Sequence, residues 1–389
     1  MENCNDLNEL MKELKASPIH SMSLGSKELF HSDFWAWIME NAKGRKEFLK
    51  LFFDDVEFPD PEIKREYHNM DIVIYPDKNA QDKGFYVIEN KIKSYPNKEQ
   101  LERYAEKEDG SFKQGVITGI MNPEFDDLTD WKYISYDEIG ARLKDIAKYE
   151  ETDFYKELLT TYANYISLLS RIIKEFDASI ENCLPIWNDQ LKTLNELRIG
   201  DIGQKYAASR FLKQCEGDPR FKEIKNEIES GPEGYKLATW YSFSNGSYTI
   251  DFRICHDPKT PDKADMGIQI QGKEYRLYAE VVGKDNYDKT AAVNHCDILF
   301  KELCNNNWLN ENFDKKEKTR YEHNGLIGTS QTKMYGRYTG RSGEIQDKWY
   351  SFVYQYFDIT KDTSSYEFII NSVIADLRNA LRIMDNSDK

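Results

Sequence analysis

The chain has 389 residues, which is enough for two or three domains of ordinary size. Charged residues make up 31% and hydrophobic residues 40%, a composition typical of soluble globular proteins, and 25 tyrosines and 20 phenylalanines argue against disorder. The formal net charge of −15 argues against a protein that coats nucleic acid or a membrane surface by bulk electrostatics. Any contact with nucleic acid therefore has to come from a local patch or through a bound metal ion.

The cysteines are scattered and form no Cys-x-x-Cys pair. They are Cys4, Cys183, Cys215, Cys255, Cys296 and Cys304. This usage fits a reducing cytoplasm, which is the location we expect. Two pairs of neighbours, Cys255-His256 and His295-Cys296, leave a zinc site open, although small buried thiols are the simpler interpretation. The acidic N-terminal segment has no signal-peptide pattern and no apolar run approaches the length of a membrane span, so no membrane contact is expected.

The first part of the chain, residues 1–176, has the pattern of an α/β domain. Apolar residues at helical spacing predict helices, and short alternating runs between turn signals predict strands. The expected helices are 7–15, 26–41, 46–53, 97–108, 137–148 and 154–176, and the expected strands are 63–67, 70–75, 85–91, 114–120 and 131–135. In helix 26–41 we expect the stripe of Leu29, Phe30, Phe34, Trp37 and Ile38 to face the core.

The remainder has a different organisation. Residues 177–232 are helical in pattern and are predicted to be a linker region, which ends at Gly231-Pro232. Residues 233–389 are predicted to form an α+β domain that recognises substrate or partner. Its expected strands are 238–243, 247–255, 266–270 and 275–282, with hairpin turns at Asn245-Gly246 and Gln271-Gly272, and its expected helices are 292–304 and 368–384.

Two carboxylates and one lysine are predicted to meet on neighbouring strands. Glu89 and Lys91 are two residues apart on one strand, so they share a face. Asp71 begins the preceding strand, and antiparallel pairing brings it beside Glu89. The alternative is that all three are exposed salt-bridging residues of an edge strand.

Such a group has a chemical use. Two close carboxylates repel each other, so a divalent cation between them is favourable, and hard oxygen ligands suit Mg²⁺ or Mn²⁺. The metal lowers the pKa of a bound water and neutralises charge on a phosphoryl group. Lys91 would hold the attacking water or stabilise the transition state, and the sequence leaves open whether its ammonium stays charged.

Three further residues are expected near this group. Gln100 and Tyr104 lie four residues apart and therefore share one face of the next helix. Glu28 lies on the Ser32 and Trp35 side of the early helix, away from the expected apolar stripe, and could supply another oxygen ligand.

The combination resembles the PD-(D/E)XK nuclease superfamily, in particular a branch of uncharacterised bacterial and phage proteins with an E-N-K-I strand and a Q-L-x-x-Y helix. The matching motifs are residues 26–37, Asp71, Glu89-Asn90-Lys91-Ile92 and Gln100 to Tyr104, and they cover residues 26–136, roughly a third of the chain. One departure is Met70, where the name-giving motif has proline.

The resemblance implies a restriction-endonuclease-like core, a central mixed sheet flanked by helices, and roles for the matching residues. Asp71, Glu89 and Glu28 would bind Mg²⁺ (or Mn²⁺), Lys91 would position the nucleophile, and Gln100 and Tyr104 would support the site. The expected activity is metal-dependent hydrolysis of phosphodiester bonds, with DNA as the expected substrate. The alternatives are a catalytically silent nucleic-acid-binding or protein-interaction module and an enzyme directed at RNA. Whether the chain forms a homodimer is left open.

Some residues outside these motifs are also candidates. In the glycine-rich segment 325–343, Lys333, Arg337 and Arg341 are four residues apart with tyrosines between them, which suits phosphate contact and base stacking. Lys93 shares a face with Lys91 and could reach a phosphate. The alternatives are a mobile surface loop and a solvated lysine. His31 is expected to be a packed or capping residue, and Asp265 and Glu280 are expected to be exposed strand carboxylates.

Overall fold

The computed structural model describes residues 2–23, 27–79, 84–92, 98–106, 111–122, 129–180, 182–185, 189–231, 234–244, 246–256, 263–284, 289–303, 320–324, 326–329, 333–335 and 348–387. The chain forms two compact units, each described here by itself. Unit 1 comprises Met1–Ser179 with Lys192–Gly203, and unit 2 comprises Ile180–Leu191 with Gln204–Lys389. The predicted linker, residues 177–232, stays a prediction, and its helices are divided between the two units.

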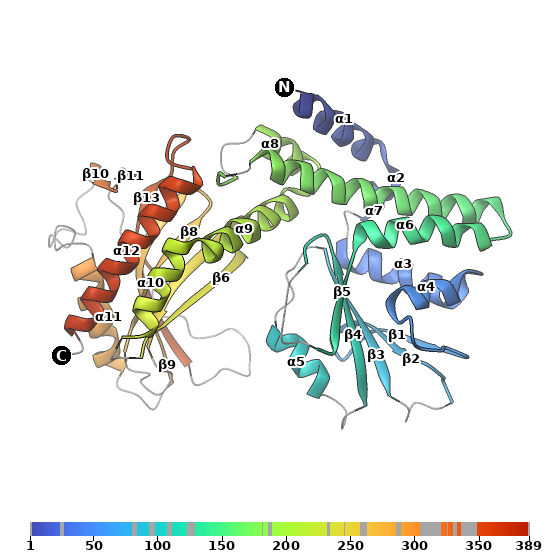
Figure 1. The fold of residues 1–389 in the computed structure, drawn as a ribbon, viewed down its shortest axis with the longest axis horizontal. Coiled ribbons are helices and arrows are strands. Elements are labelled where there is room, and N and C mark those ends of the chain that lie inside the picture. Colours follow the sequence, from blue (N-terminus) through green and yellow to red (C-terminus); the bar gives the residue numbers. More distant parts are fainter. Residues whose placement is uncertain are drawn as a thin grey trace. The chain divides into compact units, whose positions relative to one another are not determined.

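Unit 1 is built on a five-stranded mixed sheet in the order β1-β2-β3-β4-β5, which confirms the predicted fold class (Figure 1). Its strands are β1 (Glu62–Tyr67), β2 (Met70–Tyr75), β3 (Phe85–Lys91), β4 (Phe112–Gly119) and β5 (Trp131–Ser135). The first three strands pair antiparallel, and β3, β4 and β5 pair parallel. The strand β3 is therefore central, with one antiparallel and one parallel neighbour.

Helices cover the two faces of this sheet unequally. They are α1 (Glu2–Ala16), α2 (Pro18–Ser23), α3 (Lys27–Asn41), α4 (Arg45–Phe52), α5 (Lys98–Glu106), α6 (Tyr136–Ile146) and α7 (Asp153–Ser179), with α8 (Asp189–Glu196) partly in this unit. On one face α5 packs Leu101 and Tyr104 against Val73, Val87 and Ile117. On the other face α3 contacts β1, β2 and β3, while α6 contacts β5 and packs against α7 (Figure 1).

The predicted core face of α3 is wrong in part. Its fully buried side includes Ser32 and Trp35, whereas Leu29 is 36% exposed. Phe34 packs on Tyr162 of α7, with ring centroids 4.4 Å apart, and is only partly buried. Because the sheet lies on one side of α3 and α7 on another, the helix has no single apolar stripe.

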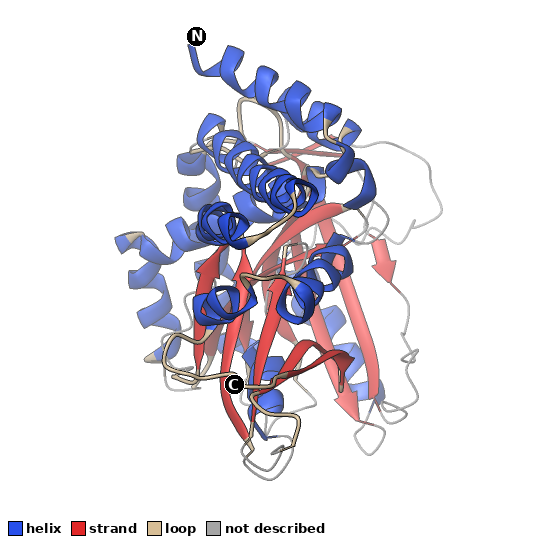
Figure 2. Cartoon of the chain, turned by 90° about the vertical axis from the view of Figure 1, so that its right-hand side faces the viewer, coloured by secondary structure: helices blue, strands red, loops and turns tan. Residues whose placement is uncertain are grey.

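Unit 2 contains an eight-stranded antiparallel sheet in the order β10-β11-β13-β9-β8-β7-β6, with β12 also paired to β13. Its strands are β6 (Lys236–Ser244), β7 (Ser247–Cys255), β8 (Asp265–Gln271), β9 (Glu274–Lys284), β10 (Arg320–His323), β11 (Leu326–Thr329), β12 (Lys333–Tyr335) and β13 (Lys348–Asp358). Its helices are α9 (Gly200–Gly217, whose first turn belongs to unit 1), α10 (Pro219–Glu229), α11 (Lys289–Leu303) and α12 (Tyr366–Ser387). Figure 2 distinguishes the helices (blue) from the strands (red) of the chain.

The two predicted hairpin turns are confirmed. Gly246 and Gly272 have φ angles of 77° and 55°, a region that glycine enters without the clash a Cβ atom would cause. By contrast, the long strand β13 was not predicted, although it pairs with β9 over its whole length.

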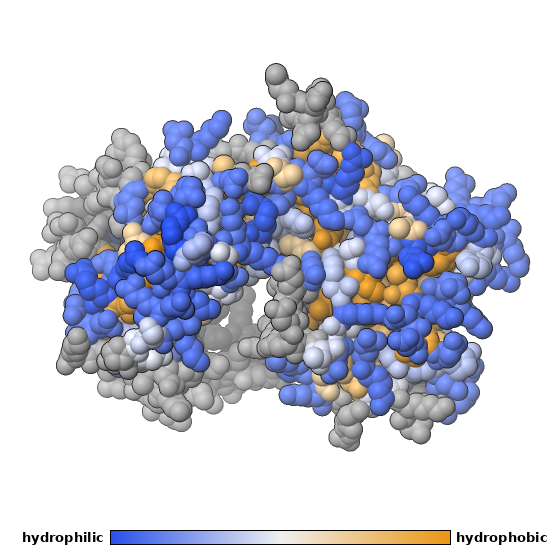
Figure 3. Space-filling model, in the orientation of Figure 1, coloured by the Kyte–Doolittle hydropathy of each residue, from blue (hydrophilic) through white to orange (hydrophobic). Residues whose placement is uncertain are grey.

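The surface is largely hydrophilic on the face shown in Figure 3, as the high charge content leads one to expect. Among the residues that the structure describes, no helix is both long enough and apolar enough to span a bilayer.

One face of the sheet of unit 2 carries a buried polar network. Tyr278 donates a hydrogen bond of 2.5 Å to Asp251, and Arg253 donates one of 2.9 Å to Tyr278. Arg253 also forms an ion pair with Glu280, and its guanidinium lies 4.6 Å from the ring centroid of Trp240. The expectation that Glu280 is an exposed strand carboxylate is wrong, because this residue is 5% exposed and burial raises its pKa to about 7.

The His–Cys neighbours considered as zinc ligands lie in this unit too. The rings of His256 and His295 approach to 6.4 Å, but the Nδ1 atom of His295 accepts the N–H of Ala264, and the ring of His256 contacts Asp265. Within the described ranges no three or more His, Cys, Asp or Glu side chains are grouped as metal ligands. Cys215 and Cys296 are buried, as expected for small packed thiols.

We expect Arg253→Met to destabilise unit 2 by about 3–5 kcal/mol at pH 8, because it leaves the carboxylate of Glu280 buried without its cation. Urea unfolding followed by tryptophan fluorescence measures the loss. Arg378→Met, which breaks exposed ion pairs with Glu223 and Glu227, should cost no more than about 1 kcal/mol. Equal losses in the two variants would contradict the buried-pair interpretation.

Candidate active site

The sheet of unit 1 brings Asp71 and Glu89 together. The antiparallel register pairs Ile72 with Ile88, so the preceding residue of β2 lies opposite the following residue of β3. The main-chain N–H of Asp71 points at Oε2 of Glu89 over 3.4 Å, and the N–H of Asn90 donates to Oδ2 of Asp71 over 2.7 Å. The alternative of exposed residues on an edge strand does not hold, since β3 is central and Glu89 is 1% exposed.

Lys91 lies on the same face as Glu89, as the strand geometry predicts. Its Nζ atom is 2.7 Å from Oε1 of Glu89, and its side chain is 11% exposed. Gly119 of β4 makes room at this point, because a Cβ atom there would lie 2.6 Å from the main-chain oxygen of Lys91. The last residue of the β3 strand is therefore held close to its parallel neighbour.

The helix α5 adds Gln100 and Tyr104 from the same side. Gln100 donates a hydrogen bond of 3.3 Å to Oε1 of Glu89 and a second one to the hydroxyl of Tyr104. Tyr104 in turn donates to the main-chain oxygen of Asn69, over 2.5 Å, just before β2 begins. The two residues thus link α5 to both strands that carry the carboxylates.

Glu28 comes from the first turn of α3. The side chain of Asn90 donates to its main-chain oxygen over 3.1 Å, which ties this turn to β3. The negative charge of Glu28 raises the pKa of Asp71 and favours the charged form of Lys91. It does not combine with Asp71 and Glu89 into a group of three carboxylates arranged for a metal, judged on the described ranges.

Burial sets the protonation of this group. It raises the pKa of Asp71, against the hydrogen bond from Asn90 and the charge of Lys91. Burial also raises the pKa of Glu89 to about 7, and the charge of Asp71 adds to the effect. For Lys91 burial acts in the opposite direction, but the neighbouring carboxylates outweigh it and raise the pKa, so the ammonium stays charged.

These residues fit a divalent cation. Glu89 is buried and Asp71 is half-buried, and both carboxyl groups resist ionisation. A hard divalent cation between two such carboxylates favours their ionised forms. Asp71 and Glu89 would hold the metal through oxygen atoms. Since Mg²⁺ prefers six oxygen ligands and usually keeps several waters, two carboxylates suffice as protein side-chain ligands.

The remaining residues singled out in the sequence lie outside the group of Asp71, Glu89 and Lys91 or outside the described residues. His31 is fully buried, its Nδ1 atom lies 2.6 Å from the hydroxyl of Tyr162, and burial lowers its pKa to about 3, so it is a neutral packed residue as expected. Lys333 lies on the short strand β12, but its side chain lies outside the described residues. Lys93, Arg337 and Arg341 also lie outside them, so their predicted contacts with nucleic acid stay predictions.

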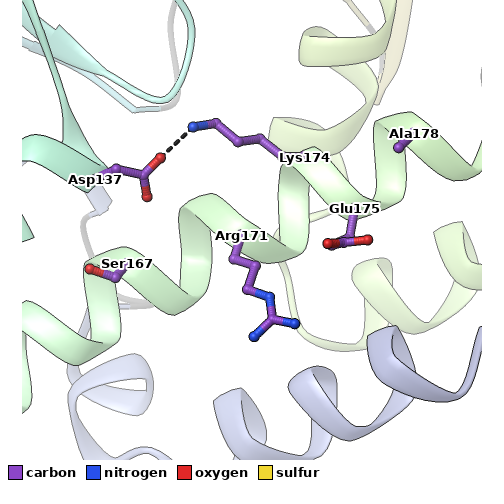
Figure 4. Close-up of a pocket in the computed structure, with 6 residues that line it drawn as sticks. All are labelled: Asp137, Ser167, Arg171, Lys174, Glu175 and Ala178. Carbon is purple, nitrogen blue, oxygen red and sulfur yellow. Dashed lines mark hydrogen bonds and ion pairs between the residues drawn. The ribbon is translucent and has the colours of Figure 1, made fainter. Parts of the chain in front are cut away.

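A cavity of about 550 Å³ lies at α6 and α7 and shares no residue with the carboxylate group (Figure 4). Its lining consists of Asp137, Ser167, Arg171, Lys174, Glu175 and Ala178. Figure 4 shows the side chain of Lys174 turned towards Asp137, with which it forms an ion pair, and the guanidinium of Arg171 turned away. The charges within this cavity are thus partly neutralised by its own lining.

The comparisons with known proteins agree with the geometry. Residues 20–164 match the family model described as the PD-(D/E)XK nuclease superfamily. This region belongs to the PD-(D/E)XK nuclease superfamily. The PD-(D/E)XK region contains Glu28, Asp71, Glu89, Lys91, Gln100 and Tyr104. No curated protein and no solved structure matches the chain.

Two residues that interact with the PD-(D/E)XK site, Asn90 and Arg65, are not among the site residues predicted from the sequence. Asn90 was noted only as a letter of the strand motif, and its side chain lies on the opposite face from Glu89 and Lys91. Arg65 of β1 was not noted at all, and its positive charge favours the ionised form of Asp71. Only the pairing of β1 with β2 brings Arg65 near the site, so the local sequence carried no signal for it.

Proposed function

We propose that this protein is a divalent-metal-dependent nuclease that hydrolyses phosphodiester bonds, with DNA as its substrate. The observation that supports it most is the group of Asp71, Lys91 and the buried Glu89 on neighbouring strands of the PD-(D/E)XK region. Membership in the superfamily makes a nuclease and a nucleic-acid substrate the first expectation. The choice of DNA rests on the resemblance of the motifs, and recognition of substrate or partner is assigned to the C-terminal unit.

The roles of the side chains follow from their contacts. Mg²⁺, held by Asp71 and Glu89 with Glu28 as a proposed third source of oxygen, would supply an activated water and neutralise charge on the phosphate. Lys91 keeps its positive charge and can hold the attacking oxygen or stabilise the phosphoryl group as negative charge grows. Gln100 fixes the orientation of Glu89, and Tyr104 fixes α5 against the start of β2.

The test is incubation of the full chain with labelled single- and double-stranded DNA and RNA in the presence of Mg²⁺, Mn²⁺ or EDTA. We expect products from DNA only when a divalent metal is present and none from Asp71→Asn. Asp54→Asn, at an exposed carboxylate that pairs with Lys132 in the same unit, is the matched control and should cleave normally.

Two results would contradict the proposal. Cleavage that continues in EDTA or in Asp71→Asn would show that another site acts. Binding of nucleic acid without cleavage would instead favour a silent binding module, the alternative that the net charge of −15 favours. Cleavage of RNA alone would correct the substrate.

A further inference from the structure

Asn90 lies between the two functional residues of β3 but points the other way. Successive side chains of a strand alternate between its faces, so Glu89 and Lys91 face α5 while Asn90 faces α3. Asn90 is 1% exposed. A buried amide is costly unless its polar atoms are hydrogen-bonded, so the partners of this side chain indicate what it is for.

The partners of Asn90 connect three parts of unit 1. Its main-chain N–H donates to Oδ2 of Asp71 over 2.7 Å. Its Nδ2 atom donates to the main-chain oxygen of Glu28 over 3.1 Å and contacts Oγ of Ser32 over 3.4 Å. Its Oδ1 atom accepts the hydroxyl of Tyr136, over 2.6 Å, from the first residue of α6. One residue thus holds a carboxylate of the site, the first turn of α3 and the start of α6.

Tyr136 determines which way the amide points. This tyrosine is fully buried, and its hydroxyl donates to Oδ1 of Asn90. With the oxygen of the amide directed at Tyr136, the NH₂ group is directed at α3, where it meets the carbonyl of Glu28. The Ser32 hydroxyl donates to the same carbonyl over 3.1 Å, so the first turn of α3 is held by two donors.

The residue whose carbonyl accepts these two hydrogen bonds is Glu28, which also carries a carboxylate near the start of α3. The charge of Glu28 affects both Asp71 and Lys91. A rotation or shift of this turn would move that carboxylate relative to the other two. The residues that orient metal ligands commonly change metal affinity about 10–100-fold when they are replaced.

We propose that Asn90 is a positioning residue, which ties the first turn of α3, and with it Glu28, to the strand that carries Glu89 and Lys91 and thereby sets the affinity of the site for a divalent cation. This inference rests on the proposed function. It goes beyond it by assigning a role to the face of β3 that carries no acid or base, and by making Tyr136 and Ser32 part of the same arrangement.

The test is calorimetric titration of the full chain with Mn²⁺ alone, without nucleic acid. We expect Asn90→Asp, which keeps the size of the side chain but replaces the NH₂ donor by an acceptor, to weaken Mn²⁺ binding at least about 10-fold. Tyr136→Phe should weaken it less, because the amide stays but loses its orientation. The matched control is Thr118→Val, since Thr118 lies opposite Asn90 on β4, is fully buried and makes no side-chain hydrogen bond among the described residues.

The decisive comparison is with Glu28→Gln. If Asn90 acts through Glu28, the double variant should bind Mn²⁺ no more weakly than Glu28→Gln alone, whereas independent effects would multiply. Wild-type affinity in Asn90→Asp, multiplying losses, or an equal loss in Thr118→Val would each overturn the proposal. Circular dichroism verifies that each variant is folded, and where Asn90→Asp does not fold, Tyr136→Phe with and without Glu28→Gln decides the same question.

Different results would overturn the nuclease activity and the positioning role of Asn90. A wild-type chain that binds no Mn²⁺ and cleaves nothing would overturn the proposed function and this inference with it. A wild-type chain that binds Mn²⁺ and cleaves DNA, beside an Asn90→Asp variant of equal Mn²⁺ affinity, would leave the nuclease standing and remove only the positioning role.

Discussion

Replacing Lys91 by alanine is expected to slow DNA cleavage about 10²–10³-fold while Mn²⁺ still binds. The ammonium lies 2.7 Å from Oε1 of Glu89, and the surrounding carboxylates keep it charged. A fixed charge in a buried site stabilises a transition state more than water does, because it needs no reorganisation as the reaction proceeds. Metal binding should persist, since removing a positive charge leaves both carboxylates free to bind the cation.

The measurement is the rate of DNA cleavage at saturating Mg²⁺, with Mn²⁺ affinity measured in parallel. Lys132→Ala is the matched control, because this lysine lies on β5 of the same sheet and, among the described residues, forms its ion pair with the exposed Asp54. Lys91→Arg keeps the positive charge on a side chain of different geometry. It should recover part of the cleavage rate if the charge of Lys91 stabilises the transition state. Undiminished cleavage by Lys91→Ala would remove this residue from the mechanism.

Replacing Glu89 by glutamine is expected to stabilise the metal-free protein at high pH. Burial, together with the charge of Asp71, raises the pKa of Glu89 from 4.5 to about 7 in the folded state. A carboxyl whose folded-state pKa is raised contributes its full stability below its unfolded-state pKa, and this contribution is lost as the pH rises towards the folded-state value. In EDTA, the wild-type chain should therefore lose stability between about pH 4.5 and pH 7.

Thermal unfolding in EDTA from pH 5 to pH 8 measures this loss. Glu89→Gln should flatten the curve and be about 1–3 kcal/mol more stable than the wild type at pH 8. Adding Mg²⁺ should raise the melting temperature of the wild type, with little effect on the variant. Glu138→Gln, at an exposed position at the start of α6, is the control and should follow the wild type. Parallel curves for wild type and Glu89→Gln would show that the site is not under electrostatic strain.

The pairing of β2 with β3 could be predicted because it depends on local signals. Alternation along each strand assigns Glu89 and Lys91 to one face, and a short connection makes antiparallel pairing the expected arrangement. The helical spacing of Gln100 and Tyr104 was equally local. The sequence could thus place five of the six predicted site residues near one another before any tertiary contact was known.

Three features could not be predicted from the sequence, because local patterns do not show them. The buried side of α3 was assigned wrongly because the sheet and α7 cover different sides of one helix. The strand β13 was missed because it is rich in aromatic residues on both faces and shows no simple alternation of polar and apolar residues. The contacts of Asn90 with Glu28 and Tyr136 join residues 62 and 46 positions apart, so no local sequence pattern predicts them.

The central position of β3 also has a consequence for how the site is lost. A strand bonded on both sides opens only when the surrounding sheet opens, so its amides are expected to exchange with solvent at the slow limit set by global unfolding of the unit. Glu89 and Lys91, the proposed site residues of this strand, are therefore expected to share the lifetime of the folded unit. The site is preformed before substrate arrives, and local fraying does not switch it off.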